Sequence, residues 1–275
     1  MISYNEKCGK LLSALDIYTD KDVMIAFSGG VDSSLLLKIA CDFAKKKGTK
    51  VFAVTVHTEL HPINDLEIAK RVAKEFGAIH CIVKMDELKE AGIGNNPVNR
   101  CYLCKKCLFT KLKEMAEEEK IEYILEGTNE DDQHVYRPGI QALKELQIKS
   151  PLADAMMEKE DIRKFASEYQ ISVANRPSAP CLATRFPYGT MLSYELMQKV
   201  EAGEEYIRGL GLYNIRLRIH DEIVRIEVDQ EDITNLVANK DCIISYLKNL
   251  GFVYITVDLE GFRSGSMDLH IDQDK

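Results

Sequence analysis

The sequence predicts an α/β protein, with a doubly wound parallel sheet followed by a smaller C-terminal α+β domain. Four short apolar runs alternate with helical patterns over residues 20–150. Alternation of strand and helix is typical of a parallel sheet that helices cover on both faces. A proline-rich stretch then separates this region from shorter elements in mixed order. We therefore expect two domains, residues 1–188 and residues 189–275.

The elements of the first domain follow one another with recognisable boundaries. Val51–Val56 is almost wholly apolar, which fits a strand buried on both faces. The helical pattern after residue 33 ends in three lysines and Gly48, a basic last turn with a glycine cap, and the next helix closes at Gly77. The expected strands are about 23–27, 51–56, 78–83 and 123–127, and the expected helices are about 1–20, 33–47 and 63–76, with a cysteine-bearing helix before the fourth strand.

The second domain begins after a segment that we expect to be irregular. Three prolines and a glycine fall between residues 170 and 192, which forbids a regular element there. The elements expected beyond it are a helix at about 193–209, strands near 213–219 and 223–228, a helix near 230–249 and a strand near 252–259.

Length and composition restrict the class of protein. The chain has 275 residues, of which 45% are hydrophobic, and its formal net charge is −8. This acidic balance argues against broad nucleic-acid binding, which leaves a basic footprint. No apolar run approaches the roughly 20 residues that a membrane helix needs, and the charged residues within Met1–Asp20 argue against a signal peptide. We expect a cytoplasmic protein with no membrane or nucleic-acid partner.

The segment after the first strand combines small residues with an acid at a strand-to-helix junction. Glycines let the backbone approach a phosphate closely, and unpaired N–H groups at a helix N-terminus attract anions. No lysine follows as in a Walker A loop, and the GxGxxG spacing of a dinucleotide-binding loop is absent. The alternative is an ordinary tight turn, which leaves Asp32 and its two serines unexplained. The predicted phosphate-binding residues are Ser28, Gly29, Gly30, Asp32, Ser33 and Ser34.

A second polar loop, residues 127–132, follows the predicted fourth strand. Because ligands of such sheets bind at the carboxyl ends of the strands, we expect this loop and the first one to face one crevice. Gly127, Asn129 and Asp132 are therefore assigned to nucleotide binding. Asp131 and Asp132 are second candidates, after Asp32, for holding a metal ion.

Three of the eight cysteines, Cys101, Cys104 and Cys107, lie within seven residues. This CxxCxxC pattern predicts either zinc or an iron–sulfur cluster. No second CxxC completes a zinc site, and no fourth cysteine followed by proline completes a ferredoxin-type run. We therefore expect Cys181 to supply a further ligand. The alternative is a helix whose first turns are rich in cysteine by chance.

Cys181 lies in the proline-rich segment, between Arg176 and Arg185. Nearby cations favour the thiolate, which is the reactive and metal-binding form of the side chain. Cys181 is therefore predicted to be functional. The alternative is a cysteine buried in a loop.

The predicted strand at 213–219 alternates strictly, so that Arg216, Arg218 and His220 share one face. Three cations on one strand of an acidic protein suggest a site for a carboxylate or phosphate. The alternative is a solvated face whose charge is balanced by neighbouring acidic residues. Arg263, in the segment that closes the last strand, is a further candidate for the same pocket.

Together these segments resemble the LarE family of ATP-dependent sulfur transferases, within the PP-loop ATP pyrophosphatase superfamily. The pattern SGGxDS is shared across the superfamily, whereas PSAPCLATRFPYG and GFRSGSMD are specific to the family. The resemblance runs through nearly the whole chain, in the segments SGGVDSS, NPVNRCYLCKKCLF, GTNEDDQHVYRPG, SPL, PSAPCLATRFPYG, LRIHDEIVRIEV and VYITVDLEGFRSGSMD.

The resemblance implies an enzyme that adenylates a carboxylate of pyridinium-3,5-biscarboxylic acid mononucleotide with ATP and Mg²⁺. It then replaces AMP by sulfur, in nickel-pincer nucleotide biosynthesis. In one branch of the family a loop cysteine gives up its own sulfur, and in another three cysteines hold a [4Fe-4S] cluster that carries a transferable sulfide. Cys181 matches the loop cysteine, and Cys101 and Cys104 match the pair that the cluster branch adds. Cys107 is a further thiol, a possible ligand that the resemblance leaves unassigned.

The resemblance also implies roles for the polar residues and for partners. Asp32 would hold the metal ion or order the loop. Arg216 and Arg218, with Arg263, would grip the phosphate and carboxylate of a small-molecule nucleotide substrate. The protein would be a homo-oligomer joined through its C-terminal domain, and a sulfide source or cysteine desulfurase would supply the sulfur.

Three other functions stay open at this point. A PP-loop tRNA thiolase also pairs the loop with a three-cysteine [4Fe-4S] cluster, but it would need a basic surface. An amidating synthetase of the NAD or GMP synthetase type would use ammonia and leaves the cysteines unexplained. A zinc-binding scaffold would bind zinc without cleaving ATP.

Overall fold

The computed structural model describes residues 2–134, 138–177, 180–263 and 265–267. Parts of three segments quoted above, at 135–137, 178–179, 264 and 268–275, lie outside the described residues.

The chain separates by its contacts into two compact units. Unit 1 comprises Met1–Ile93 and Asn99–Ala179, and unit 2 comprises Gly94–Val98 and Pro180–Lys275. The division falls between residues 179 and 180, nine residues before the expected position. The reason is that residues 180–187 bond within unit 2: Arg185 pairs with Glu204 at 2.9 Å, and the Asn96 amide donates to the carbonyl of Phe186 at 3.1 Å.

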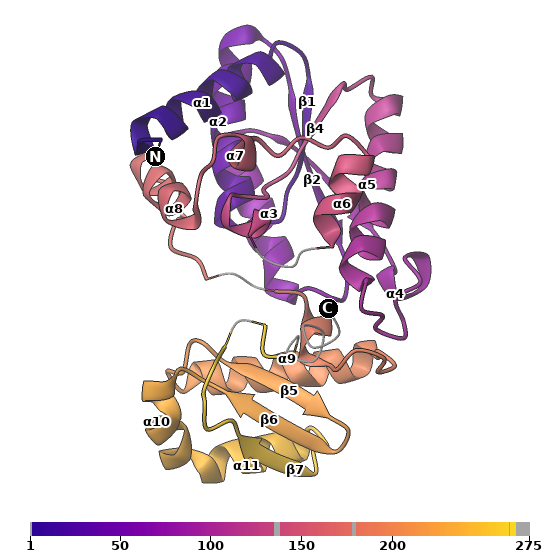
Figure 1. The fold of residues 1–275 in the computed structure, drawn as a ribbon, viewed down its shortest axis with the longest axis vertical. Helices are drawn as coiled ribbons and strands as arrows, with labels where there is room; N and C mark the ends of the chain where they lie inside the picture. Colours follow the sequence, from indigo (N-terminus) through magenta and orange to yellow (C-terminus); the bar gives the residue numbers. More distant parts are fainter. Residues whose placement is uncertain (1, 135–137, 178–179, 264, 268–275) are drawn as a thin grey trace. The chain divides into compact units, whose positions relative to one another are not determined.

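Unit 1 contains the predicted parallel sheet, in the order β3-β2-β1-β4 (Figure 1). Its strands are β1 (Val23–Ala26), β2 (Val51–His57), β3 (Ile79–Lys84) and β4 (Tyr123–Leu125). Val23 of β1 pairs with Val51 of β2 on one side and with Tyr123 of β4 on the other. The chain order therefore reverses between β1 and β4, which makes this the switch point where such sheets bind ligands.

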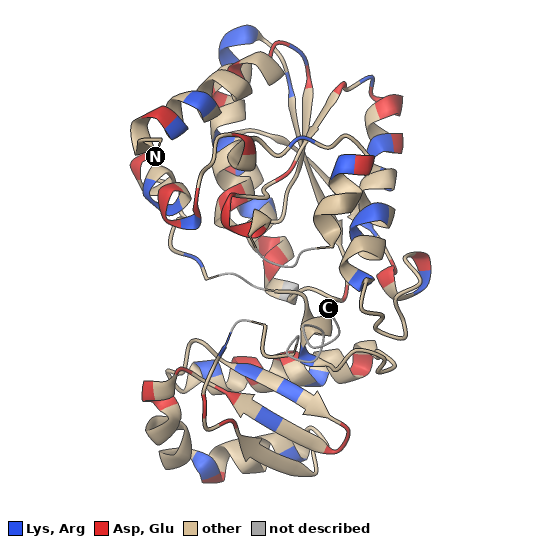
Figure 2. Cartoon of the chain, in the orientation of Figure 1, with Lys and Arg blue, Asp and Glu red and all other residues tan. Residues whose placement is uncertain are grey.

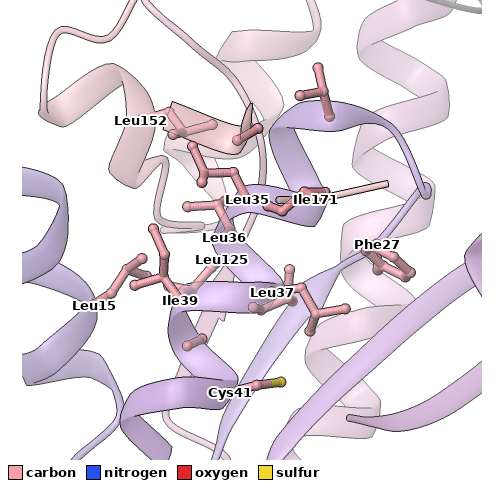
Figure 3. Close-up of a cluster of buried hydrophobic side chains, with 14 of the residues drawn as sticks. Leu15, Phe27, Leu35, Leu36, Leu37, Ile39, Cys41, Leu125, Leu152 and Ile171 are labelled. Carbon is pink, nitrogen blue, oxygen red and sulfur yellow. The ribbon is translucent and has the colours of Figure 1, made fainter. Parts of the chain in front are cut away.

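Helices cover both faces of this sheet. They are α1 (Tyr4–Tyr18), α2 (Val31–Lys47), α3 (Ile63–Phe76), α4 (Glu87–Glu90), α5 (Arg100–Glu118), α6 (Gly139–Glu145), α7 (Pro151–Asp154) and α8 (Lys159–Glu168), with a 3₁₀ turn η1 (Asp131–Gln133). Ile25 packs with α1, α2, α3, α7 and α8 in the core that Figure 3 shows in part, while Met24 packs with α5 and α6 on the opposite face. Alternating side chains of one strand thus serve two cores.

The ends of the first helices confirm the sequence signals. Gly48 and Gly77 both cap helices in the left-handed conformation, with φ of 73° and 76°. The helix α2 starts at Val31, two residues earlier than expected, because Gly30 is its N-cap. Asp32 therefore lies in the first helical turn, where the helix dipole favours a negative charge.

Unit 2 is the expected small α+β unit. Its elements are η2 (Leu182–Arg185), α9 (Tyr194–Gly209), β5 (Arg216–His220), β6 (Ile223–Glu227), η3 (Gln230–Asp232), α10 (Ile233–Ala238), α11 (Lys240–Asn249) and β7 (Tyr254–Val257). β6 is antiparallel to β5 and parallel to β7. The helix expected over 230–249 is broken, since Asn239 ends α10 and begins α11. Gly203 lets α9 approach the sheet, because a Cβ there would lie 2.5 Å from Leu217 Cδ1.

Within the described residues, no helix combines the length and the apolar character that a bilayer crossing requires.

Candidate active site

The loop between β1 and α2 is built for close contact with an anion. Gly29 has φ of +72°, and a Cβ there would lie 3.0 Å from the backbone nitrogen of Ala69, so only glycine fits against α3. Gly30 has no side chain to cap α2, which leaves the first N–H groups of the helix available. This cradle matches the phosphate site that the sequence predicts.

The serines of the loop add hydroxyl groups to the cradle. Ser33 Oγ accepts from the Ser28 amide at 3.3 Å and lies 3.2 Å from Ser28 Oγ. Ser34 is fully buried, and its Oγ has no hydrogen-bond partner within the described residues. A buried hydroxyl without a partner is costly, which makes the Ser34 hydroxyl a candidate donor to a bound group. An oxygen of a nucleotide phosphate would supply one.

The loop after β4 meets the first loop, as the sequence predicted. A Cβ on Gly127 would lie 3.1 Å from Asp32 Cβ and 3.2 Å from the Ser33 nitrogen. The Asn129 side-chain amide donates to Asp32 Oδ1 at 3.3 Å. Asn129 in turn exchanges two bonds with Asp132, each of 3.2 Å. The acid and the two loops therefore form one constellation at the switch point.

Lys159 belongs to this constellation, although the sequence analysis did not find it. It is the first residue of α8, its Nζ forms an ion pair with Asp32 Oδ2, and its backbone N–H donates to Asp131 Oδ2 at 2.8 Å. The structure has a capping box at the start of this helix, formed by Glu158 and Asp161. The usual sequence signature is Ser or Thr followed three residues later by Glu or Gln, and Glu158 with Asp161 does not match it, so the sequence contained no clear signal.

The acidic side chains at this site suit magnesium. Mg²⁺ is usually held by one or two carboxylates together with waters and substrate phosphates, rather than by a complete protein cage. Asp32 offers such a carboxylate beside the phosphate cradle, and the Lys159 ammonium already occupies its Oδ2. The donor set therefore fits Mg²⁺ bound together with ATP.

The clustered cysteines lie among the first eight residues of α5, which begins at Arg100. Cys101 is exposed, while Cys104 and Cys107 are half-buried. Cys104 Sγ donates to the Glu87 carboxylate at 3.2 Å, and Glu87, itself buried, accepts from Thr58 Oγ1 at 2.6 Å. Burial raises the pKa of the Cys107 thiol.

Thiols are the ligands that iron–sulfur clusters use, so Cys101 and Cys104 fit such a group by their chemistry. Cys181 belongs to unit 2 and directly precedes η2. In the part of the chain that the structure describes, no three side chains of His, Cys, Asp or Glu form a group that would hold a metal ion. The ligand set of Cys101, Cys104 and Cys181 therefore stays a prediction.

The two arginines that flank Cys181 in the sequence have carboxylate partners. Arg176 pairs with Asp65, and buried Arg185 pairs with Glu204 at 2.9 Å. Arg185 also donates to the Cys181 carbonyl at 3.3 Å. Since each guanidinium has its charge matched by an acid, the expected stabilisation of a Cys181 thiolate by these two cations is weakened.

The arginines of β5 differ in what they contact (Figure 2 marks the charged residues). Arg218 is buried and bonds Glu227 through Nε at 3.0 Å and Nη2 at 2.9 Å, while its Nη1 donates to the Thr184 carbonyl at 3.0 Å. Arg263 pairs with Glu260 at 2.6 Å and lies 3.5 Å from Asp258. The charges of both arginines are therefore matched inside unit 2.

Arg216 is the exception on this face. Its guanidinium lies 5.1 Å from the centre of the Phe262 ring and donates to the Ile215 carbonyl at 2.7 Å. Among the described residues no carboxylate lies within ion-pair distance of it. Burial, and then the nearby Arg185, lower the pKa of Arg216 to about 10. A half-buried cation without a counter-charge is well suited to bind an anionic ligand.

A family model and several relatives align with large parts of this chain. A family model described as a PP-loop domain matches residues 3–136, which contain both loops and the cysteines of α5. The pyridinium-3,5-bisthiocarboxylic acid mononucleotide synthase of Lactiplantibacillus plantarum is 36% identical over 90% of this chain and 88% of its own. Proteins described as uncharacterized are 37% identical in Synechocystis sp., over 89% of this chain and 91% of theirs, and 33% identical in Methanocaldococcus jannaschii, over 90% and 93%.

The phosphate cradle, the acid at the start of α2 and an alignment through nearly the entire length of these relatives lead to one assignment. The chain belongs to the LarE family of PP-loop proteins and is an ATP-dependent sulfurtransferase.

Proposed function

We propose that this enzyme adenylates a carboxylate of pyridinium-3,5-biscarboxylic acid mononucleotide and converts it to a thiocarboxylate, for nickel-pincer nucleotide biosynthesis. The observation that carries the proposal is the bond between Asn129 and Asp32, which gathers acid, amide and phosphate cradle at one edge of the sheet. The L. plantarum relative, whose name contains the bisthiocarboxylic product, supports the choice of substrate.

The first step forms an acyl adenylate. A carboxylate oxygen of the substrate attacks the α-phosphorus of ATP, the bond to the β-phosphate oxygen breaks, and pyrophosphate leaves with the electron pair. The backbone N–H groups at the start of α2 and the Ser34 hydroxyl would bind the polyphosphate, and Asp32 would hold the Mg²⁺ bound to it. Lys159, which pairs with Asp32, would neutralise part of the developing charge.

The second step replaces AMP by sulfur. A sulfur nucleophile attacks the acyl carbon, the bond to the AMP oxygen breaks, and a thiocarboxylate and AMP result. Arg216 is the residue we expect to hold the anionic substrate, because its charge has no carboxylate partner among the described residues. Arg218 would act indirectly, by fixing β5 through Glu227.

We further propose that the transferred sulfur comes from an iron–sulfur cluster. Cys101, Cys104 and Cys181 would hold a [4Fe-4S] cluster, which on three thiolates keeps one iron open for a transferable sulfide. A sulfide source or cysteine desulfurase would reload it. Whether Cys107 is also a ligand of the cluster is decided by the variants described below.

An anaerobic assay of iron and acid-labile sulfide, with electron paramagnetic resonance, tests the ligand set. Wild type is compared with Cys101→Ala, Cys104→Ala, Cys107→Ala and Cys181→Ala, and with Cys242→Ala as a matched control on α11. We expect loss of the cluster signal in the Cys101, Cys104 and Cys181 variants alone. Absence of a cluster from anaerobic wild type would overturn this source of sulfur. It would leave the route in which Cys181 gives up its own sulfur.

A product assay tests the reaction itself. Enzyme, Mg²⁺-ATP, sulfide and the pyridinium dicarboxylic mononucleotide should give a thiocarboxylate together with AMP and pyrophosphate. Parallel reactions supply ammonia in place of sulfide, or tRNA in place of the mononucleotide. An amide product or thiolated tRNA, without the thiocarboxylate, would contradict the proposal.

A further inference from the structure

Arg176 lies beside the phosphate cradle and has no part in the chemistry described so far. Its Nη1 donates to the Gly29 carbonyl at 3.4 Å, and its Nη2 forms an ion pair with Asp65. It follows α8 in the chain, and its two bonds therefore join three segments of unit 1: the cradle, α3 and the stretch after α8. The pair is mostly buried, with 20% and 18% of the two side chains exposed.

The contacted carbonyl belongs to the peptide group whose N–H is that of Gly30. In a trans peptide the C=O and N–H point in opposite directions, so a bond that fixes the carbonyl also aims the N–H. A peptide between two glycines has little steric resistance to rotation, and Gly29 already has a positive φ. Within the described part of the chain, the Gly30 N–H makes one bond, a long one of 3.4 Å to Ser28 Oγ, so it is available to donate to a phosphate oxygen.

Asp65 gives Arg176 a fixed position. Asp65 and Ala69 are one turn apart on α3 and therefore share a face. Ala69 is the residue whose backbone would lie 3.0 Å from a Cβ on Gly29. The same face of α3 thus packs against the cradle and holds the arginine that bonds to it. Because the ion pair between Arg176 and Asp65 is partly buried, solvent screens it less than it would screen an exposed pair.

We propose that Arg176 is a positioning residue of the ATP site. It fixes the Gly29–Gly30 peptide so that the Gly30 N–H faces the nucleotide phosphates, and Asp65 holds it in place. A cation on the carbonyl also polarises the peptide and strengthens the N–H as a donor. The proposal depends on ATP binding and not on the identity of the sulfur acceptor.

Nucleotide affinity of the full-length protein tests the proposal. Binding of Mg²⁺-ATP and of adenosine is measured by calorimetry for wild type, Arg176→Ala, Arg176→Lys and Asp65→Asn. The control is Arg71→Ala, because Arg71 lines the same hollow of about 320 Å³ as Arg176, and the described residues show no bond between it and the cradle.

We expect Arg176→Ala to bind ATP about tenfold more weakly than wild type, the usual effect of losing one hydrogen bond, here from the Gly30 N–H to a phosphate oxygen. The affinity for adenosine, which has no phosphate, should not change. Arg176→Lys should recover part of the loss, because an ammonium can reach the carbonyl but cannot span carbonyl and carboxylate with two nitrogens. The ATP affinity of Asp65→Asn should lie between those of wild type and Arg176→Ala. The ATP affinity of Arg71→Ala should equal that of wild type.

Equal ATP affinity of Arg176→Ala and wild type would overturn the proposal. So would an equal loss of ATP and adenosine binding, which would show a general disruption of the fold. If Arg176→Ala does not fold, then Arg176→Lys and Asp65→Asn decide, and wild-type ATP affinity in both contradicts the proposal. A wild type that binds no ATP would overturn the ATP-dependent function as well.

Discussion

Asn129 donates its side-chain amide to Asp32 Oδ1 at 3.3 Å, which ties the loop after β4 to the first turn of α2. The second oxygen of the same carboxylate is paired with Lys159. Asp32 is therefore held from two sides, by elements that are 97 and 127 residues away in the chain. Such support fixes the direction in which the carboxylate offers its lone pairs to a metal ion.

Replacing Asn129 by alanine should free Asp32 to rotate. We expect pyrophosphate release to fall about 10- to 100-fold at limiting Mg²⁺, the usual effect of losing a partner that orients a metal ligand. The rate is measured as a function of Mg²⁺ concentration, with Asn249→Ala, an exposed asparagine at the end of α11, as the control. An unchanged Mg²⁺ dependence in Asn129→Ala would argue against the supporting role.

Lys159→Gln removes the ammonium from Asp32 and from the phosphate cradle. The KM for ATP should rise about tenfold, since a charge-assisted contact to the phosphates is lost. Steady-state kinetics with ATP as the varied substrate measure this. Arg163→Gln changes an exposed cation of the same helix and should behave as wild type. Identical KM values for Lys159→Gln and Arg163→Gln would exclude Lys159 from the site.

The sheet of unit 1 could be predicted because its strands and caps are encoded locally. The apolar run at β2 and the left-handed glycines 48 and 77 occupy their expected positions. Parallel order then places the two polar loops together without further information. The short helices α4, α6 and α7 were missed because four to seven residues give little periodicity.

The partners of the basic residues could not be predicted from sequence. Strict alternation placed Arg216 and Arg218 on one face, and both do lie on it. It did not indicate that Glu227, on the neighbouring strand, pairs with Arg218, nor that Arg216 has no carboxylate partner among the residues the structure describes. Likewise, Arg176 lies near Cys181 in the sequence, but its partner is Asp65, 111 residues away. Ion-pair partners depend on tertiary packing, which a periodic pattern does not contain.

Arg218 and Arg216 should therefore respond differently to substitution. Arg218→Ala leaves Glu227, which is fully buried, short of a counter-charge and should lower the free energy of unfolding by about 3 kcal/mol. We take the low end of the usual range because Arg225 still lies 3.3 Å from Glu227. Arg216→Ala should cost less than about 1 kcal/mol and instead weaken substrate binding. Urea unfolding compares the two, and equal destabilisation would contradict the distinction.

His80 should make folding sensitive to acid. Burial, and then the charge of Lys70, lower the pKa of this imidazole, whose Nε2 lies 2.8 Å from Thr55 Oγ1 and whose ring meets Phe27 edge-on. The folded state binds the proton less readily than the unfolded state. The contribution of neutral His80 to the free energy of unfolding is therefore fully present above the unfolded pKa of about 6.5 and is lost below it.

The free energy of unfolding of wild type and His80→Gln, measured from about pH 8 to pH 5, checks the sign. We expect wild type to lose more stability than the variant on acidification. A variant that loses as much as wild type would show that His80 is protonated equally in both states. His220, whose pKa burial also lowers, is present in both proteins and cancels in the comparison.

In the proposed reaction, ATP activates a carboxylate of the substrate before sulfur enters. This order can be tested with pyridinium-3,5-biscarboxylic acid mononucleotide that carries oxygen-18 in its carboxylates. Mass spectrometry of the AMP formed with Mg²⁺-ATP and sulfide then gives the answer. We expect AMP to acquire a labelled oxygen from the substrate, because the acyl carbon keeps one carboxylate oxygen and the departing AMP takes the other. Unlabelled AMP, formed alongside a thiocarboxylate product, would contradict it.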